Sequence, residues 1–416
     1  MLFKYKPKIV AVTGSVGKTS TKDAIYSVLS GSVYTGKSSK SFNSEIGLPL
    51  AILIGSKSGW NNPLKWLKTL FNGVVLVVFK SHYPNWLVLE AGVDRPGDMD
   101  STISLIKPNI AVVTNLPDTP AHVEYFDSAS AVYDEKWKLV GALRAGGTLI
   151  ANGDDKNIRS RIEKVSDKNI LTYGFGETAM VRGAHIQTTY KEYDGIEFPS
   201  GITFKLEYKE NSVPVQIEGT LGEGHILSAL AAASVGISLE INSIKIAHGI
   251  QEGDTPPGRL KLLKGINNSL IIDDTYNSSP GAAILALNIL SGTRCSGKKI
   301  VVLGDMLELG EKTVPEHIEA GKNIPEDVKL IYAVGHRARH IGEGAIQAGH
   351  KKGDMKFYEH AEQAARNIIK RIEPGDIVLV KGSQFMRLEK LVAEIMEEKE
   401  SKERLLVRQD KAWSKR

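Results

Sequence analysis

Residues 13–20, with the sequence Thr-Gly-Ser-Val-Gly-Lys-Thr-Ser, constrain the fold of this chain more than any other segment. An apolar run at Lys8–Val12, typical of a buried strand, precedes them, and a helical pattern from about Thr19 to Leu29 follows. Glycine allows a tight loop whose amide groups surround an anion, and the start of a helix adds partial positive charge. The strict Walker pattern G-x-x-x-x-G-K-T is absent, and the shorter form T-G-x-x-G-K-T is present.

This motif favours a nucleotide-phosphate site over a structural turn, because a Lys-Thr pair rarely falls at the start of such a helix by chance. Lys18 is expected to contact the β- and γ-phosphates, and the Thr19 hydroxyl is expected to reach Mg²⁺. The predicted nucleotide-binding residues of the loop are Gly14, Ser15, Val16, Gly17, Lys18, Thr19 and Ser20.

The first 255 residues alternate apolar strand patterns with helical patterns. Strands are predicted at 86–90, 110–114 and 147–152, and continuous apolar runs separated by helices are typical of a parallel sheet covered on both faces. From about Ile170 to Glu218, hydrophobic and polar residues alternate, which indicates a small antiparallel sheet. We therefore predict an α/β fold with a phosphate-loop central domain at 1–255.

A second α/β domain is predicted after the Pro- and Gly-containing segment at 253–258. The alternation of strands and helices restarts there, and we expect a Rossmann-like C-terminal domain over residues 256–398. Residues 399–416 are mostly charged and are expected to form a helical extension or a loose tail. The predicted strands of this domain are 269–273, 299–303, 330–334 and 376–380.

Composition disfavours several classes of protein. The chain of 416 residues has 53 basic and 48 acidic residues, and a net charge of +5 on this length does not indicate a nucleic-acid-binding protein. Cys295 is the single cysteine, so no internal disulfide can form, which fits a reducing cytoplasm. Neither a signal peptide nor an apolar run of membrane-spanning length is recognisable, and we expect a cytoplasmic protein.

Two residues that follow predicted strands are candidate metal ligands. Glu90 ends a buried strand, and a carboxylate at the carboxyl end of a parallel strand lies on the ligand side of the sheet. Because Mg²⁺ takes one or two carboxylates beside substrate phosphates, Glu90 suits this role, and the alternative is a solvated residue at a strand end. His122 follows the strand at 110–114 and is either a second ligand or a surface histidine.

Four segments outside the phosphate loop carry a family resemblance. Residues 41–49, SFNSEIGLP, resemble N-F-N-N-E-I-G-x-P, and residues 273–280, DDTYNSSP, resemble D-D-x-Y-N-A-N-P. Residues 303–310, LGDMLELG, match another signature, and residues 380–383, VKGS, resemble V-K-G-S-R with Gln in place of the Arg. With the phosphate loop, these segments resemble the Mur ligase family, ATP-dependent amide ligases that extend the peptide of bacterial cell-wall precursors. They are most similar to the branch that joins D-alanyl-D-alanine to UDP-N-acetylmuramoyl-tripeptide.

The resemblance implies ATP and Mg²⁺ as cofactors, and a reaction in which ATP phosphorylates the terminal carboxylate of the acceptor peptide. The amine of D-alanyl-D-alanine then attacks the acyl phosphate, and phosphate leaves. The implied partners are UDP-N-acetylmuramoyl-tripeptide, or a related acceptor, and D-alanyl-D-alanine. Such chemistry depends mainly on positioning and on electrostatic stabilisation by Mg²⁺, lysine and backbone donors.

The resemblance also implies roles for single residues. Lys136 falls where the family has a carbamylated lysine that helps to hold Mg²⁺, and the alternative is an exposed helical lysine. Lys381 resembles a strand-end residue that faces the active-site cleft, and the alternative is a surface lysine. The predicted metal ligands are Thr19, Glu90, His122 and Lys136, and the predicted catalytic residues are Lys18, His122 and Lys136. The predicted nucleotide contacts outside the loop are Asn43, Arg259, Asp274 and Asn277, of which the last three also suit a hinge or a turn.

Two departures from the family pattern bear on substrates and partners. The family normally has a domain of roughly a hundred residues before the phosphate loop, which binds the UDP-sugar, and here the loop begins at residue 13. Either another chain supplies this domain, or the acceptor is bound differently, or it is not a UDP-sugar. Residues 56–84 form an insertion in which apolar residues such as Leu67 and Leu70 recur at helical spacing. This segment is either an interfacial helix that contacts the inner membrane leaflet at about 60–80, or a helix packed on its own sheet or on a partner subunit.

Three other functions stay open from the sequence. The first keeps the chemistry but uses a non-UDP acceptor or a separate acceptor-binding partner. The second is a non-catalytic nucleotide-binding partner of a cell-wall complex, which the retained metal set disfavours. The third is a P-loop GTPase or small-molecule kinase, which would need no second α/β domain in contact with the nucleotide. The oligomeric state is not determined by the sequence.

Overall fold

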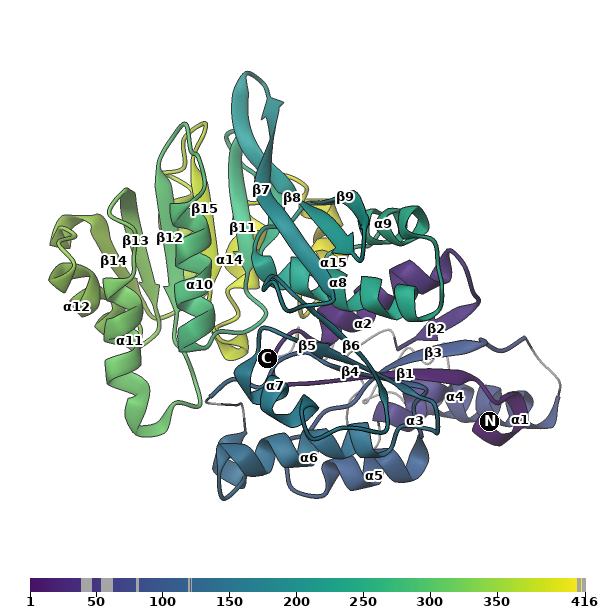
Figure 1. The fold of residues 1–416 in the computed structure, drawn as a ribbon. Helices are drawn as coiled ribbons and strands as arrows, with labels where there is room; N and C mark the ends of the chain where they lie inside the picture. The colour runs from purple at the N-terminus through teal and green to yellow at the C-terminus, as the bar shows by residue number, and fades with distance from the viewer. Residues whose placement is uncertain are drawn as a thin grey trace. The chain divides into compact units, whose positions relative to one another are not determined.

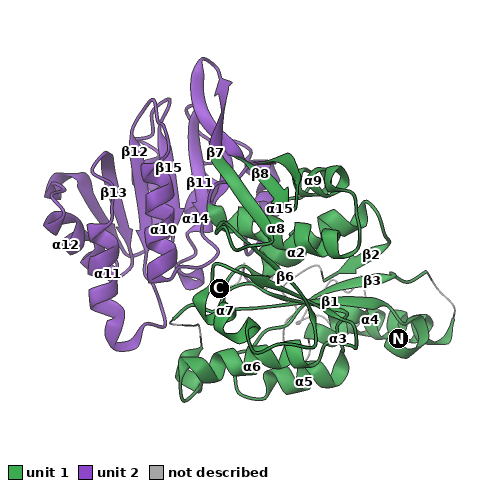
Figure 2. Cartoon of the chain, in the orientation of Figure 1, with its two compact units in different colours: residues 1–186, 203–216, 223–254 green, residues 187–202, 217–222, 255–416 purple. Residues whose placement is uncertain are grey.

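The computed structural model describes residues 1–38, 47–53, 63–79, 82–118, 120, 122–409 and 413, except for the side chains of 63–65. The chain divides into two compact units, which Figure 2 shows in different colours. The first unit contains residues 1–186, 203–216 and 223–254, and the second contains residues 187–202, 217–222 and 255–416.

The first unit carries most of a large, mainly parallel sheet (Figure 1). Its parallel strands are β1 (Lys8–Thr13), β2 (Thr35–Lys37), β3 (Trp86–Glu90), β4 (Ile110–Val113), β5 (Thr148–Asn152) and β6 (Asn169–Gly174). Over the described residues the sheet has nine strands in the order β2-β3-β1-β4-β5-β6-β7-β8-β9. The predicted strand before the phosphate loop is β1, which is buried from its second residue onward and lies centrally among the parallel strands.

The antiparallel strands predicted before residue 218 are present and continue the edge of the same sheet. They are β7 (Val181–Tyr193), β8 (Ile196–Tyr208) and β9 (Asn211–Glu218). β7 first pairs in parallel with β6, with Val181 beside Tyr173. It then turns into β8 through Asp194 and Gly195, which both have positive φ, as a two-residue type I′ hairpin requires. The antiparallel strands are therefore an extension of the parallel sheet.

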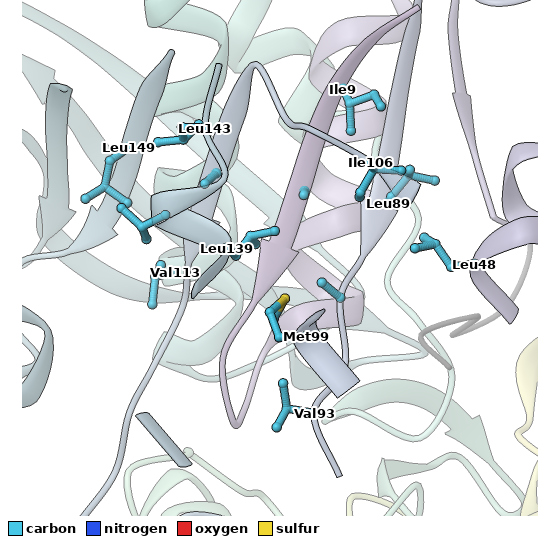
Figure 3. Close-up of a cluster of buried hydrophobic side chains, with 14 of the residues drawn as sticks. Ile9, Leu48, Leu89, Val93, Met99, Ile106, Val113, Leu139, Leu143 and Leu149 are labelled. Atoms are coloured by element: carbon cyan, nitrogen blue, oxygen red, sulfur yellow. The ribbon is translucent and has the colours of Figure 1, made fainter. Parts of the chain in front are cut away.

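Helices cover both faces of the parallel strands (Figure 1). α2 (Lys18–Ser30), α8 (Glu223–Ser238) and α9 (Ser243–Gln251) pack on one another on one face. The other face is covered by α3 (Gly47–Ile52), α5 (Asp98–Leu105), α6 (Ala129–Gly141) and α7 (Lys156–Ile162). Strand side chains alternate between the two faces of a sheet. Ile9 of β1 and Leu89 of β3 therefore lie in the core between the sheet and this second group of helices, with Met99 and Leu139 (Figure 3).

Three further helical segments complete the first unit. They are α1 (Leu2–Tyr5), α4 (Pro63–Val78) and the 3₁₀ turn η1 (Val123–Tyr125). The helix predicted within the insertion is present as α4. Among the described residues, no helix combines the length and the apolar character that crossing a membrane would require.

The second unit contains a six-stranded sheet over the described residues, in the order β10-β11-β15-β12-β13-β14. The strands are β10 (Lys261–Gly265), β11 (Ser269–Asp274), β12 (Lys299–Gly304), β13 (Val328–Val334), β14 (Met355–Tyr358) and β15 (Ile377–Lys381). β10 is antiparallel to β11, and the other pairs are parallel. The α/β architecture predicted for the C-terminal part is confirmed, with β10 and β14 as additional edge strands.

The helices of the second unit alternate with these strands (Figure 1). They are α10 (Pro280–Ser291), α11 (Thr313–Lys322), α12 (Arg339–Gln347), α13 (Ala361–Ile368), α14 (Glu389–Ile395) and α15 (Lys402–Leu405). Short 3₁₀ turns are η2 (Gly310–Lys312), η3 (Lys352–Asp354), η4 (Gln384–Met386) and η5 (Lys399–Ser401).

Residues 405–408, in the segment expected to be a helical extension or a loose tail, pack onto the second unit. Leu405, Leu406 and Val407 are buried, and the Arg408 side chain is 6% exposed. The Arg408 guanidinium donates to Oε2 of the fully buried Glu389 at 2.9 Å and to the carbonyl oxygens of Thr275 and Tyr276. This contact holds the loop that follows β11.

We predict that Arg408→Ala lowers the free energy of unfolding by about 2–4 kcal/mol, because it leaves a buried carboxylate without one of its cations and two carbonyl groups without a donor. Arg404→Ala, a substitution of an exposed arginine nearby, is the matched control and should change stability by less than about 0.5 kcal/mol. Urea denaturation followed by circular dichroism measures both. Equal stability of the two variants would contradict the role assigned to Arg408.

Candidate active site

The phosphate loop joins β1 to α2 at the carboxyl end of the parallel strands. Its backbone depends on two glycines with positive φ, Gly14 at 140° and Gly17 at 85°, and Gly17 is the N-cap residue of α2. A Cβ atom at Gly14 would lie 2.1 Å from Oγ1 of Thr114, so only glycine fits this position. The chain changes its direction across the sheet between β1 and β4, which is where open α/β sheets bind ligands.

The end of β4 holds the loop in place. The Thr114 hydroxyl donates to the carbonyl oxygen of Val16 at 2.6 Å, and the amide of Ser15 donates to the carbonyl oxygen of Asn115 at 2.8 Å. The Asn115 side chain donates in turn to Asp155, the N-cap residue of α7, at 3.0 Å. The residues directly after β4, held in turn by the N-cap residue Asp155, therefore set the conformation of the loop. The Ser15 amide is already hydrogen bonded to the protein.

Lys18 begins α2, and its side chain folds back over the loop. Its ammonium group donates to the carbonyl oxygens of Gly14 at 2.9 Å and Ser15 at 3.3 Å. The cation therefore already lies against the segment that the sequence predicts to surround a phosphate. An anion bound in the loop would compete with these two carbonyl oxygens for the ammonium.

Thr19 and Glu90, which the sequence predicts to share a Mg²⁺ ion, are in direct contact. The Thr19 hydroxyl donates to Oε2 of Glu90 at 3.0 Å, although 71 positions separate the two residues in the chain. The parallel pairing of β1 with β3 sets Val12 beside Glu90 and so brings the end of β3 to the start of α2. Glu90 is 3% exposed, so the solvated strand-end alternative is wrong.

These two oxygen groups fit a magnesium ion that arrives with a nucleotide. Mg²⁺ binds carboxylate and hydroxyl oxygens and usually completes its shell with phosphate oxygens and water. Within the part of the chain that the structure describes, no group of three or more His, Cys, Asp or Glu side chains could hold a metal ion. The residues therefore do not form a cage that would bind a metal ion by itself.

Lys136 lies on α6 and is only 3% exposed, which excludes the exposed helical lysine that spacing alone allowed. Its Nζ donates to the carbonyl oxygen of Val93 at 3.5 Å. Burial, with a smaller contribution from the nearby Lys18 ammonium, lowers the pKa of Lys136 to about 8, against the opposite effect of Asp94 and other carboxylates. A larger fraction of this side chain is therefore uncharged near neutral pH than for an ordinary lysine.

His122 is exposed and lies beside a carboxylate from another loop. Its Nε2 is 3.4 Å from Oδ1 of Asp94, and its backbone has a φ of 63°. Asp94 directly follows Val93, the residue that Lys136 contacts. The segment from Glu90 to Asp94 therefore contacts the three other predicted metal ligands, Thr19, His122 and Lys136. Of the hydrogen bonds described among these four predicted ligands, one joins two of them directly, and it links Thr19 to Glu90.

Sequence reasoning missed three residues that shape this site, namely Asp94, Thr114 and Glu135. Glu135 is 6% exposed, and its Oε1 accepts from the amides of Gly97 at 3.0 Å and Met99 at 2.9 Å, which holds the turn before α5. Thr114 could have been found as a polar residue directly after the buried strand β4, and Asp94 as a carboxylate four positions after the end of β3. Glu135 has no such signal, since its hydrogen bonds are to a distant segment.

The second unit carries a separate polar cluster at the carboxyl ends of β11 and β15. Parallel pairing sets Asp274 beside Lys381, and Nζ of Lys381 donates to Oδ2 of Asp274 at 2.6 Å. The same ammonium group donates to the carbonyl oxygen of Asn277 at 3.0 Å. The Lys381 side chain is 2% exposed, so the surface-lysine alternative is wrong, and Lys381 holds the loop that carries Asn277.

Arg259 lies against the same loop. Its guanidinium is 4.2 Å from the centroid of the Tyr276 ring, and the Tyr276 amide donates to the carbonyl oxygen of Gly258 at 3.0 Å. Arg259, Asp274 and Asn277, three of the predicted nucleotide contacts, are therefore brought together within this unit.

A buried carboxyl group precedes this cluster. Asp273 is fully buried, and its Oδ1 accepts from the Thr275 hydroxyl at 2.6 Å and from the Thr275 amide at 3.2 Å. Its Oδ2 has no hydrogen-bond partner within the described residues. Burial raises the pKa of Asp273 to about 6, so its ionised form is held at a cost in stability above that pH.

The two remaining signature segments contribute differently. Asn43 lies outside the described residues, and its predicted contact with the nucleotide stays a prediction. The buried His317 of α11 holds the loop after β12: its Nε2 accepts from the Met306 amide at 2.9 Å, and its Nδ1 donates to the carbonyl oxygen of Thr313 at 2.6 Å. Burial lowers the pKa of His317, so a neutral imidazole holds this loop.

Comparison with known protein families identifies both parts of the chain. The Mur ligase middle domain matches residues 12–236, more than half of the sequence. The chain belongs to the Mur ligase family. A second match, to the glutamate ligase domain of Mur ligases, covers residues 258–384. The family resemblance inferred from the motifs is confirmed.

Curated and solved relatives cover most of this Mur ligase. The UDP-N-acetylmuramoyl-tripeptide–D-alanyl-D-alanine ligase of Bacillus subtilis (strain 168) is 28% identical over 391 residues, which are 94% of this chain and 76% of the relative. A crystal structure of MurF from Acinetobacter baumannii is 26% identical, with a TM-score of 0.75 over 94% of this chain and 77% of that one. MurF ligase from Thermotoga maritima in complex with ADP is 24% identical, with a TM-score of 0.73 over 96% and 82% of the two chains, and shares the fold.

We predict that Gly14→Ala destabilises the protein by about 2–4 kcal/mol, because the new Cβ collides with Thr114 at a φ that L-residues rarely adopt. Gly31→Ala is the matched control, since Gly31 ends α2 with a φ of −74° and no atom lies within 4 Å of the added Cβ. Thermal unfolding of both variants measures the difference. A Gly14 variant as stable as the Gly31 variant would show that the loop does not depend on the approach to Thr114.

Proposed function

We propose that this Mur ligase joins D-alanyl-D-alanine to the terminal carboxylate of UDP-N-acetylmuramoyl-tripeptide, or of a related acceptor, at the expense of ATP. The observation that carries this proposal is the contact between Thr19 and Glu90 beside the phosphate loop, in a chain 28% identical to a ligase named for that reaction. The match to the Mur ligase middle domain, over residues 12–236, includes the phosphate loop, and the match over residues 258–384 includes the Asp274 cluster.

The proposed reaction has two steps. A carboxylate oxygen of the acceptor attacks the γ-phosphorus of ATP and displaces ADP, which gives an acyl phosphate. The amine of D-alanyl-D-alanine then attacks the acyl carbon, loses a proton, and displaces inorganic phosphate as the amide bond forms. Mur ligases are positioning enzymes in this scheme, because negative charge is spread over phosphoryl and carbonyl oxygens that fixed cations and amides can stabilise.

The residues of the first unit suit the phosphoryl-transfer step. Lys18, now bonded to Gly14 and Ser15, would turn its ammonium group toward the β- and γ-phosphates of ATP. Thr19 and Glu90 would hold Mg²⁺, which when bound supplies positive charge against the phosphate oxygens. The β4 end keeps the loop rigid through Thr114, so the phosphates would meet a preformed backbone.

Lys136 and His122 are proposed to extend this set. Carbamylation joins carbon dioxide to an uncharged amine and releases a proton, so the lowered pKa of Lys136 favours it. The modified side chain would be anionic and could help to hold a magnesium ion together with His122. The Lys18 ammonium lies close enough to Lys136 to lower the pKa of Lys136, which supports a location near the phosphates.

The second unit is proposed to supply further nucleotide contacts. Arg259, Asp274 and Asn277 lie in one cluster, whose loop Lys381 and Arg408 hold from two sides. We retain the domain limits 1–255, 256–398 and 399–416 as a proposal. Since the reaction consumes ATP and a nucleotide-linked acceptor, we expect the protein in the cytoplasm.

We predict that the protein with Mg-ATP, D-alanyl-D-alanine and UDP-N-acetylmuramoyl-tripeptide releases phosphate and forms the pentapeptide product. Glu90→Gln should lower kcat by about 100-fold or more, because it removes the carboxylate that faces Thr19. Glu163→Gln, at an exposed position at the end of α7, is the control and should stay within about twofold of the original activity. Phosphate release and mass spectrometry of the product are measured together.

The outcomes separate the alternatives. Phosphate release without a new amide product would mean that the acceptor is a different carboxylate. Neither phosphate release nor product, in a protein that still binds ATP, would favour a non-catalytic partner or a missing acceptor-binding chain. Full activity of Glu90→Gln would overturn the assignment of the metal site.

We also predict that ¹³C-labelled bicarbonate gives a carbamate signal in the ¹³C NMR spectrum of the protein, and that Lys136→Arg removes this signal. Ligase activity of the same variant should fall by about 100-fold. Lys156→Arg, at an exposed lysine on α7, should retain both the signal and the activity. Absence of a carbamate in the original protein, or its persistence in Lys136→Arg, would reject the modification.

A further inference from the structure

Helix α4 presents an apolar face that no described part of the chain covers. Leu67, Leu70, Phe71, Val74, Val77 and Val78 are all more than half exposed. At 100° per residue, these six positions fall within an arc of about 120° around the helix. An apolar stripe of this width normally faces a protein core, and here it faces outward.

Contacts outside this apolar stripe hold α4 on the first unit. Gly73 is buried, and a Cβ atom at that position would lie 3.2 Å from a methyl group of Leu53, so the helix backbone is close to the end of α3. Residues of α1 hold the end of the helix. Lys4 donates to the carbonyl oxygens of Leu76, Val77 and Phe79, and Tyr5 donates to that of Leu76 at 2.8 Å. The outward direction of the apolar stripe is therefore fixed by the contact at Gly73 and by the hydrogen bonds at the end of the helix.

The exposed apolar surface extends beyond the helix itself. Phe3 of α1 is 95% exposed, and Phe79, directly after α4, is 64% exposed. Tyr5 stacks on Tyr83 with their ring centroids 4.6 Å apart, which keeps α1 beside the end of α4. Exposed apolar groups gathered in this number mark a binding surface rather than an ordinary water-facing surface.

The two chain segments that contain this surface carry charges of one sign. Residues 1–22 and 46–89, which contain α1 and α4, include no aspartate or glutamate. Lys4, Lys6 and Lys68 are exposed beside the apolar residues. A surface that combines an apolar stripe with lysines, on segments without acidic residues, is complementary to anionic lipid, which offers acyl chains below negatively charged headgroups.

We propose that α1 and α4 form a membrane-binding surface, on which this protein rests against an anionic lipid bilayer with α4 parallel to the membrane plane. A second copy of the chain is a poorer occupant, because a symmetric contact would bring the same lysines together without any acidic partner. The proposal concerns where the protein is held and does not depend on the reaction proposed above.

Flotation of the full-length protein with vesicles tests this proposal. We expect binding to vesicles of phosphatidylcholine with phosphatidylglycerol to be at least about tenfold stronger than binding to phosphatidylcholine alone, and to weaken with added salt. Leu70→Gln combined with Phe71→Gln and Val74→Gln should abolish binding. All three positions are exposed, so the fold should be retained, and circular dichroism verifies this.

A matched control replaces three exposed apolar residues elsewhere, with Ile244→Gln, Val314→Gln and Ile346→Gln, and should bind vesicles as the original protein does. Lys6→Gln with Lys68→Gln should remove the preference for anionic lipid. Absence of vesicle binding, equal binding to both kinds of vesicle, or binding that survives the α4 substitutions would overturn the proposal. Concentration-dependent dimers that the α4 substitutions abolish, without vesicle binding, would assign the surface to a second copy.

Discussion

The parallel pairing of β1 with β3 is the constraint on which the candidate site of the first unit depends. It brings the carboxyl end of β3 to the start of α2, where Glu90 meets Thr19. A shift of one residue in this pairing would turn Glu90 toward the opposite face of the sheet. Leu87 and Leu89 prevent such a shift because they belong to the core below the sheet, as Figure 3 illustrates for Leu89. Core packing thus determines the position of a carboxylate that is not part of the core.

The residues that follow Glu90 contact the two other predicted metal ligands, Lys136 and His122. After Glu90, the carbonyl group of Val93 and the side chain of Asp94 contact Lys136 and His122. Lys136 is buried close to the Lys18 ammonium, an arrangement that costs free energy and that stability alone does not explain. Strongly perturbed titratable groups in a ligand-facing region are typical of functional sites. The second unit repeats this feature in Asp273, whose buried carboxyl lies beside the cluster of Asp274 and Lys381.

Much of this could be predicted from sequence because the signals are local. The phosphate loop is contiguous, β1, β3 and β4 are apolar runs of ordinary strand length, and Glu90 is marked by its place at a strand end. What could not be predicted depends on residues far apart in the chain. Thr114 lies against Gly14 only once β1 and β4 have paired, and Glu135 accepts from the Gly97 amide only once α6 has packed. A charged C-terminal segment gave no sign that Arg408 would be buried against Glu389.

The central claim is that Thr19 and Glu90 bind a magnesium–nucleotide complex, and calorimetric titration with a non-hydrolysable ATP analogue tests it most directly. Magnesium should strengthen binding to the original protein by at least about tenfold, and Thr19→Val, which removes one hydroxyl at nearly constant volume, should remove most of that gain. Without magnesium, the same variant should bind the analogue about as well as the original protein. An equal magnesium effect in both proteins, or no magnesium effect in either, would contradict it.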